Sequence, residues 1–141
     1  MNIPVKKLHP DAKIPQYAHP GDAGMDFFSL EELVIKPGET KQIKTGIAIA
    51  IPSGYVGLFW DKSGIAAKHS VHSMAGVIDA GYRGEILIVL RNFGQNDFVI
   101  SKHMKVAQML VQPVHSVTIV ETDNLDVTAR NTGGFGSTGM H

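Results

Sequence analysis

The sequence predicts an all-β protein whose architecture is a β-sandwich, a jelly roll or a barrel. Short runs rich in valine and isoleucine recur along the chain, and apolar residues in them alternate at a period of two. Fifteen glycines and seven prolines separate these runs about every ten residues. Only one stretch is typical of a helix. Many short strands with regular turns and almost no helix favour an antiparallel β architecture.

The clearest strand pattern is "KQIKTGIAIAI" at residues 41–51, where alternate residues place one side chain after another on a single face. Similar strand patterns are "GYVGLFW", "GEILIVL", "DFVISKH", "KVAQMLVQPV" and "SVTIVE". Turns are predicted at "KPGET", "IPSGY" and "NFGQND". The stretch "SGIAAKHS" predicts a short helix with Ser63 as its N-cap.

Bulk properties restrict the class of protein. A chain of 141 residues predicts one domain. Thirteen basic and thirteen acidic residues balance, so a basic nucleic-acid groove is unsupported. There is no cysteine, and no run approaches the ~18 apolar residues of a membrane span. We therefore expect a cytoplasmic protein without nucleic-acid or membrane partners. The β pattern stops near Asp126, which predicts a domain over 1–125 and a glycine-rich tail over 126–141.

Five stretches do not look like ordinary strands: "AGMDFFS", "DKSGIAAKH", "AGVIDAGYRGE", "KVAQML" and "ARNTGGFGSTGMH". Each also has an ordinary interpretation. Asp26 and Asp79 suit turns, Ser63 suits a helix cap, and a polar residue within a strand usually faces solvent. The chemical interpretation rests on the serine–glycine helix start, which offers donors to an anion, and on the glycine-rich tail, which lets backbone N–H groups approach oxygens.

In this order, "AGMDFFS", "KSGIAAKH", "GVIDAGYRGE", "VAQM" and "GGFGSTG" resemble the five motifs of the trimeric dUTP diphosphatases (dUTPases). The resemblance runs from about Ala23 to Gly139. It implies a distorted jelly-roll β-barrel that forms a homotrimer with sites at subunit interfaces. It also implies Mg²⁺-dependent hydrolysis of dUTP to dUMP and pyrophosphate, which keeps uracil out of DNA and supplies dUMP for thymidylate synthesis. The flexible C-terminal tail would close over a neighbouring subunit's site.

The same resemblance implies roles for individual residues. Asp79 matches the aspartate that activates the attacking water, and Tyr82 matches the ring that packs under the deoxyribose and excludes a 2′-hydroxyl. Asp26 matches the aspartate that holds Mg²⁺ through water. The remaining nucleoside contacts would be Ser73, Gly76, Val77, Ile78, Leu87 and Phe135. The phosphate contacts would be Lys62, Ser63, Gly64, Gln108, Arg130, Gly136, Ser137 and Thr138.

The chain departs from the family pattern at a few of these positions. Lys62 stands where the family usually has arginine, and a lysine cannot bond a phosphate in the bidentate manner of a guanidinium. Asp61 stands where proline is usual. Asn131 replaces a tail glycine, and asparagine tolerates left-handed backbone angles. Met74 replaces a common glycine beside the base pocket, so its side chain must point away from the base.

Three alternatives stay open at this point. A dCTP deaminase of the same superfamily would need a glutamate where this chain has Val89, and valine cannot transfer a proton. A broader deoxynucleotide diphosphatase would differ only in backbone placement around the base. A non-catalytic nucleotide-binding trimer would share the fold, although Asp79, Tyr82, Arg130 and Phe135 are all present.

Overall fold

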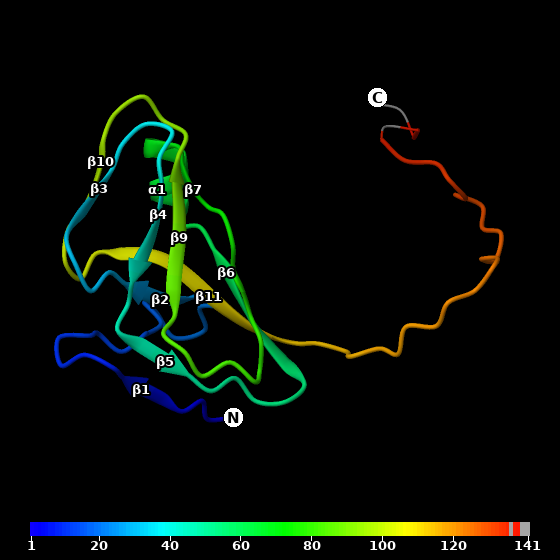
Figure 1. The fold of residues 1–141 in the computed structure, drawn as a ribbon, viewed down its shortest axis with the longest axis horizontal. Coiled ribbons are helices and arrows are strands. Elements are labelled where there is room, and N and C mark those ends of the chain that lie inside the picture. Colours follow the sequence, from blue (N-terminus) through cyan, green and yellow to red (C-terminus); the bar gives the residue numbers. More distant parts are fainter. Residues whose placement is uncertain (136, 139–141) are drawn as a thin grey trace.

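The computed structural model describes residues 1–135 and 137–138. Within these residues the chain is composed of short β-strands with one short helix, as the sequence predicts (Figure 1). The elements in chain order are β1 (Val5–Lys7), β2 (Met25–Phe28), β3 (Leu33–Ile35), β4 (Thr40–Lys44), β5 (Ile47–Ile49), β6 (Tyr55–Trp60), α1 (Ser63–His69), β7 (Val71–Ser73), β8 (Val77–Ile78), β9 (Leu87–Asn92), β10 (Phe98–Ile100) and β11 (Lys105–Pro113).

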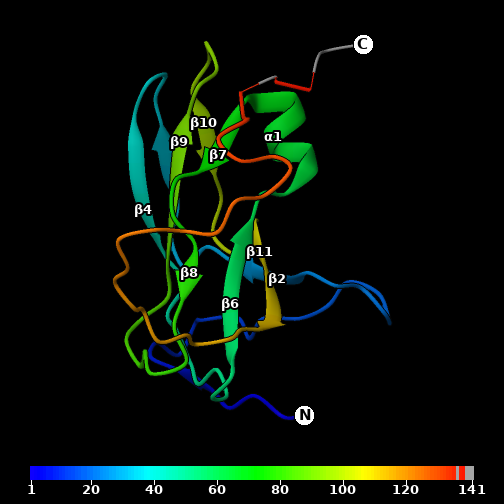
Figure 2. The ribbon, with the colours of Figure 1, turned by 90° about the vertical axis from the view of Figure 1, so that its right-hand side faces the viewer.

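The strands form two main antiparallel sheets. One has the order β2-β11-β6-β8 and the other has the order β4-β9-β7, and the pairs β1-β5 and β10-β3 complete the barrel. Figure 2 shows β6, β11 and β2 on one side and β4 and β9 on the other, with α1 at one end. Strand order departs from chain order throughout, as expected for a jelly roll rather than a meander.

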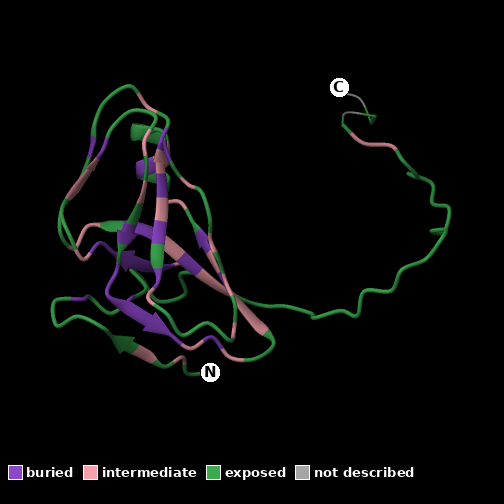
Figure 3. Ribbon diagram, in the orientation of Figure 1, coloured by how far each residue is buried: buried purple, intermediate pink, exposed green. Residues whose placement is uncertain are grey.

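The core lies between these sheets and consists of aliphatic and aromatic side chains. In β9 the burial alternates residue by residue, with Ile88 and Leu90 inside. The fully buried large side chains are Phe27, Ile35, Ile43, Ile47, Ile49, Ile51, Val71, Ile86, Ile88, Leu90, Ile100 and Met109. Figure 3 shows the buried positions gathered in the barrel. The sheet pattern at period two therefore builds one continuous apolar interior.

The run at 41–51 is two strands rather than one. β4 ends at Lys44 and β5 begins at Ile47, because Gly46 adopts a left-handed backbone angle of φ +66°. Thr45 is buried between them, and its hydroxyl donates to the carbonyl of Ile86 at 2.6 Å. The predicted face is buried as expected, since Ile43, Thr45, Ile47, Ile49 and Ile51 all lie in the core, but burial does not alternate in β5, where Ala48 is buried too.

Two local predictions are wrong. Ser116–Glu121 forms no strand, because no other segment of the described chain pairs with it, and Val117, Ile119 and Val120 are 72%, 87% and 77% exposed. The helix N-cap is Lys62 rather than Ser63: Lys62 has extended backbone angles and Ser63 is already helical. Helix α1 therefore begins without a side-chain cap.

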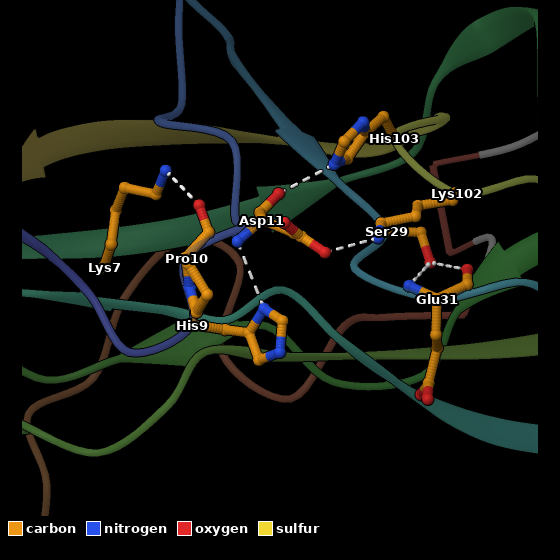
Figure 4. Close-up of polar contacts among 8 residues, drawn as sticks. All are labelled: Lys7, His9, Pro10, Asp11, Ser29, Glu31, Lys102 and His103. Atoms are coloured by element: carbon orange, nitrogen blue, oxygen red, sulfur yellow. Dashed lines mark hydrogen bonds and ion pairs between the residues drawn. The ribbon is translucent and has the colours of Figure 1, made fainter.

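A polar cluster fixes the loop that precedes β2 to the turn between β10 and β11 (Figure 4). Lys102 Nζ pairs with Asp11 Oδ2 at 2.7 Å, and His103 Nε2 donates to the carbonyl of Asp11 at 2.7 Å. Hydrogen bonding to Lys102 holds the pKa of Asp11 below its usual value. The ion pair is exposed to solvent, so it contributes little to stability.

No helix among the residues that the structure describes is long and apolar enough to cross a membrane. The cytoplasmic location expected from the sequence stays a prediction, and so does the boundary between the domain over 1–125 and the tail over 126–141. Beyond Pro113 the chain leaves the barrel as an extended segment, and in Figure 1 it arcs away from both sheets.

Candidate active site

Two of the predicted phosphate residues, Lys62 and Gln108, meet the predicted metal residue Asp26 where β2, β11 and the start of α1 come together. They line an open cavity of about 290 Å³, whose lining residues are Ala18, Asp22, Ala23, Gly24, Asp26, Lys62 and Gln108. Ser63 and Gly64, which follow Lys62 in the chain, are not among these lining residues. Antiparallel pairing sets Gln108 of β11 directly opposite Asp26 of β2 on one side and Trp60 of β6 on the other. Strand register therefore brings the first, second and fourth motifs to one place.

Asp26 is the most deeply buried charge in this cavity, with 1% of its surface exposed. Its Oδ1 accepts a hydrogen bond from Lys62 Nζ at 2.6 Å, and its Oδ2 faces Lys105 Nζ at 2.7 Å. Oδ2 has no other partner among the described residues. Burial raises the pKa of Asp26, but hydrogen bonds from Lys105 and Lys62 and their charges outweigh it and leave the pKa below its usual value.

The second motif presents its donors at the helix start. Ser63 and Gly64 are exposed and form the first two residues of α1, where backbone N–H groups have no acceptor within the helix. Lys62 sits beside them as the N-cap residue. Its ammonium group forms an ion pair with the Asp26 carboxylate rather than pointing into solvent. Lys62 thus reaches the cavity in place of the usual arginine, but its charge is already paired.

Gln108 and Gly24 depend on each other. A side chain at Gly24 would collide with the Gln108 amide, so glycine leaves the space that this amide occupies. Gln108 Nε2 donates to the carbonyl of Asp61 at 2.8 Å. An amide nitrogen carries two N–H groups, so one remains for an anion in the cavity.

Four of the predicted nucleoside residues, together with Asp79, line a separate cavity of about 190 Å³, and Gly76 is not among its lining residues. Its lining residues are Val77, Ile78, Asp79, Tyr82, Glu85 and Leu87. The turn after β8 is closed by Tyr82, whose N–H donates to the carbonyl of Asp79 at 3.0 Å and whose hydroxyl donates to the carbonyl of Glu85 at 2.9 Å. A side chain at Gly84 would collide with the Tyr82 ring, so this glycine is required for the ring position.

β6 fixes the strand that leads into the nucleoside cavity. The pairs Gly57↔Ile78 and Leu58↔Val77 join β6 to β8, and Phe59 N–H donates to the carbonyl of Gly76 at 2.9 Å. A Cβ at Gly76 would lie only 3.0 Å from the Cβ of Phe59, so glycine allows this close approach. Ser73 and Met74 lie outside this cavity, on the apolar surface that also includes Trp60.

The tail residues do not join either cavity. Arg130 Nε donates to the carbonyl of Gly133 at 2.9 Å, and Ser137 N–H donates to the carbonyl of Gly134 at 3.0 Å. Phe135 and Thr138 are exposed. Gly136 lies outside the described residues. Asn131 adopts a left-handed backbone conformation with φ +45°, which asparagine tolerates better than most residues.

The described chain thus carries two cavities that share no lining residue. We call the 77–87 cavity the nucleoside half-site and the Asp26 cavity the phosphate half-site. No group of three or more acidic or histidine side chains among the described residues could hold a metal ion by itself. Sequence reasoning missed Lys105, Asp22 and Glu85. Only the fold brings Lys105 beside Asp26, whereas Asp22 and Glu85 lie within a few residues of Asp26 and Tyr82 in the chain.

Comparison with known proteins identifies the family. The family model described as dUTPase matches residues 10–139. The chain belongs to the dUTPase family. A deoxyuridine 5'-triphosphate nucleotidohydrolase of Clostridioides difficile is 54% identical over 99% of each chain. Its counterpart from Alkaliphilus metalliredigens (strain QYMF) is 50% identical over 99% of this chain and 98% of its own.

Solved structures of dUTPases share the fold. The dUTPase of Staphylococcus bacteriophage 80alpha with dUPNHPP superposes with a TM-score of 0.93 at 31% identity over 98% of both chains. A point mutant of the dUTPase from phage phi11 of S. aureus, described with a structural Mg(II) ion, has a TM-score of 0.83 at 29% identity and covers 88% of this chain and 98% of its own. The predicted jelly-roll β-barrel is therefore confirmed.

Proposed function

We propose that this protein hydrolyses dUTP to dUMP and pyrophosphate. The observation that carries the proposal is the nucleoside half-site, where Asp79 and Tyr82 stand on the rim of a cavity walled by β8 and the start of β9. Membership of the dUTPase family supports it, as does the separate cavity of charged and amide groups suited to a polyphosphate.

Asp79 is the proposed general base. It is exposed at the mouth of the cavity and makes no side-chain hydrogen bond to a described residue, so its carboxylate is free to hold a water molecule. As the water oxygen bonds to the α-phosphorus, its proton passes to Asp79. The bond from the α-phosphorus to the bridging oxygen breaks, and pyrophosphate leaves. A positioned base of this kind contributes about 10²–10⁴-fold to a rate.

Backbone groups around the nucleoside half-site would select the base. Uracil presents an acceptor at O4 where cytosine presents a donor, so a main-chain N–H aimed at that point satisfies only uracil. A mismatch of this type is worth about 10⁴-fold in selectivity. The Tyr82 ring, fixed by its hydroxyl bond to Glu85, would lie under the sugar and leave no space for a 2′-hydroxyl.

The phosphate half-site would hold the triphosphate through Lys62, Ser63, Gly64 and Gln108. Mg²⁺ fits this site only in its outer shell, because the Asp26 carboxylate lines the cavity yet both of its oxygens already face ammonium groups. We therefore expect Asp26 to meet the ion through water. When bound, Mg²⁺ would neutralise charge on the triphosphate and favour in-line attack.

We propose that the active protein is a homotrimer in which neighbouring chains complete each site. Two observations support this. The half-sites of one chain are separate cavities, and Trp60 and the 114–127 segment expose large apolar side chains that water does not favour. The tail of a third chain would close each site, with Arg130 gripping the terminal phosphate, Phe135 stacking on uracil, and Gly136, Ser137 and Thr138 donating to the phosphates.

The proposal is tested by incubating the purified protein with each of dUTP, dCTP, dTTP and UTP in the presence of Mg²⁺ and measuring pyrophosphate. We expect dUTP to be cleaved far faster than the other three. Release of ammonia from dCTP would instead identify a deaminase, despite Val89 in β9, and equal cleavage of several deoxynucleotides would identify a broader diphosphatase. Binding without any turnover would identify the non-catalytic alternative.

A further inference from the structure

Asp61 connects three elements around the phosphate half-site. It lies between β6 and α1, and its side chain is 22% exposed. Its Oδ1 accepts the backbone N–H of Ser73 at 2.7 Å, and its Oδ2 lies 2.5 Å from Nδ1 of His72. Its carbonyl oxygen accepts Gln108 Nε2 at 2.8 Å. One residue therefore contacts both β7 and β11 while directly preceding Lys62.

The Asp61 carboxylate accepts a backbone hydrogen bond that a neighbouring strand would otherwise accept. β7 is the last strand of the sheet β4-β9-β7, and its outer edge has no strand partner in that sheet. A free backbone N–H at such an edge needs an acceptor when it is partly buried. Asp61 Oδ1 supplies this acceptor to Ser73 and so ties the three-stranded sheet to the end of β6 in the four-stranded sheet.

The partners of the Asp61 carboxylate stabilise its negative charge. Burial raises the pKa of this carboxyl, but hydrogen bonds from His72 and Ser73 lower it further than burial raises it. The carboxylate thus stays ionised beside the cavity that would receive a polyphosphate, and it is directed toward β7 rather than toward the cavity, whose lining does not include it. It acts on the site through its neighbours rather than by touching a ligand.

We propose that Asp61 is a positioning residue that holds the Lys62–Gly64 turn and the Gln108 amide in their phosphate-binding arrangement. The inference rests on the proposed function of this site. The carboxylate fixes where the turn begins. The carbonyl accepts one N–H of the Gln108 amide, so the second N–H is available to an anion. A preformed arrangement binds a ligand more tightly because less freedom is lost on binding.

The nucleoside half-site should not depend on Asp61. β8 is held to β6 by the Gly57↔Ile78 and Leu58↔Val77 pairs and by the Phe59–Gly76 hydrogen bond, none of which involves residue 61. Loss of the Asp61 carboxylate should therefore weaken binding of the triphosphate while leaving recognition of the nucleoside intact. A general loss of fold would weaken both.

The test compares Asp61→Ala with Asp61→Asn in the full-length protein. Asparagine keeps an oxygen for Ser73 N–H, whereas alanine removes it. We expect Asp61→Ala to raise KM for dUTP and the dissociation constant for inorganic tripolyphosphate by about tenfold, with a smaller change in kcat and an unchanged inhibition constant for deoxyuridine. Asp61→Asn should recover most of the affinity. Amide exchange at Ser73 should accelerate in the alanine variant only.

Asp11→Asn is the matched control. The Asp11 carboxylate also pairs with a lysine, and its carbonyl also accepts from a histidine, but these contacts lie in the cluster of Figure 4 and not at the phosphate half-site. It should change none of these quantities. Equal KM values for Asp61→Ala and the parent protein, or a parallel loss of deoxyuridine binding, would overturn the inference. Should Asp61→Ala fail to assemble, Asp61→Val, which also lacks a side-chain oxygen, takes its place with the same expectations. If the parent protein does not cleave dUTP, the proposed function fails, and Asp61 is judged on tripolyphosphate affinity and amide exchange.

Discussion

The nucleoside and phosphate half-sites of this chain differ in how they are built. The nucleoside half-site is formed by one continuous segment, residues 77–87, which connects β8 to β9, and Val77, Ile78 and Leu87 supply its apolar walls. The phosphate half-site gathers charged and amide groups from three distant segments, with Asp26 buried between two lysines. The first is suited to shape and backbone selectivity, the second to charge. From this difference we expect separate parts of the chain to control selection of the base and affinity for the triphosphate.

The largest effect is expected from Asp79→Asn. The amide cannot accept the proton of the attacking water, so kcat should fall by about 10²–10⁴-fold. The side chain is exposed, so the fold and the affinity for dUTP should be retained. Turnover by stopped assay and binding by calorimetry measure the two quantities. Near-normal turnover would show that the chemistry does not belong to the nucleoside half-site.

The next largest effect is expected from truncation after Asp126. The tail makes only local turns in the described chain, and ordering about ten residues costs on the order of 10 kcal/mol, so only a full set of phosphate and base contacts can close it. Without it, kcat/KM for dUTP should fall by about 100-fold, while the melting temperature of the barrel stays constant. Unchanged turnover would remove the tail from the mechanism.

A smaller effect concerns acid stability and the phosphate half-site. The pKa of Asp26 lies below its ordinary value of 3.8 in the folded protein. As the pH falls from about 3.8 through the folded pKa, this group therefore takes up its proton in the unfolded chain before it does so in the folded protein, and stability declines. The stability contributed by the two lysine pairs is thus present above this window and is lost within it. Chemical unfolding of the parent protein and of Asp26→Asn at several pH values measures this.

The variant should be less stable than the parent at neutral pH, because Lys62 and Lys105 lose their shared partner. Its stability should then decline less than that of the parent as the pH falls from about 5 to about 2. A parent protein and a variant with parallel pH profiles would contradict the account of Asp26.

Sequence reasoning succeeded where the determinants are local. The alternation around Ile88 and Leu90, and the turn from Asp79 to Tyr82, are contained within a few residues, so pattern and turn chemistry predict them. It failed where contacts join distant segments. Lys105 reaches Asp26 only through the β2–β11 register, and the Asp61–Ser73 bond exists only because α1 returns the chain to β7.

The error at Ser116–Glu121 has the opposite cause. The alternating residues have the composition of a strand, but a strand needs a neighbour, and none lies beside this segment in the described chain. Its exposed apolar side chains are best explained by burial against another copy in the proposed trimer. The Ser63 prediction failed because the chain begins its helix one residue earlier, with Lys62 extended toward Asp26.

The central claim, that each active site combines half-sites of different chains, is tested most directly by mixing two inactive variants. One carries Asp79→Asn, and the other carries Lys62→Ala with Gln108→Ala. Co-expressed with different tags and purified as mixed trimers, they should recover activity, because about one site in three then pairs an intact nucleoside half-site with an intact phosphate half-site. Mixed trimers as inactive as either variant alone would place both half-sites of each active site in one chain and contradict the account.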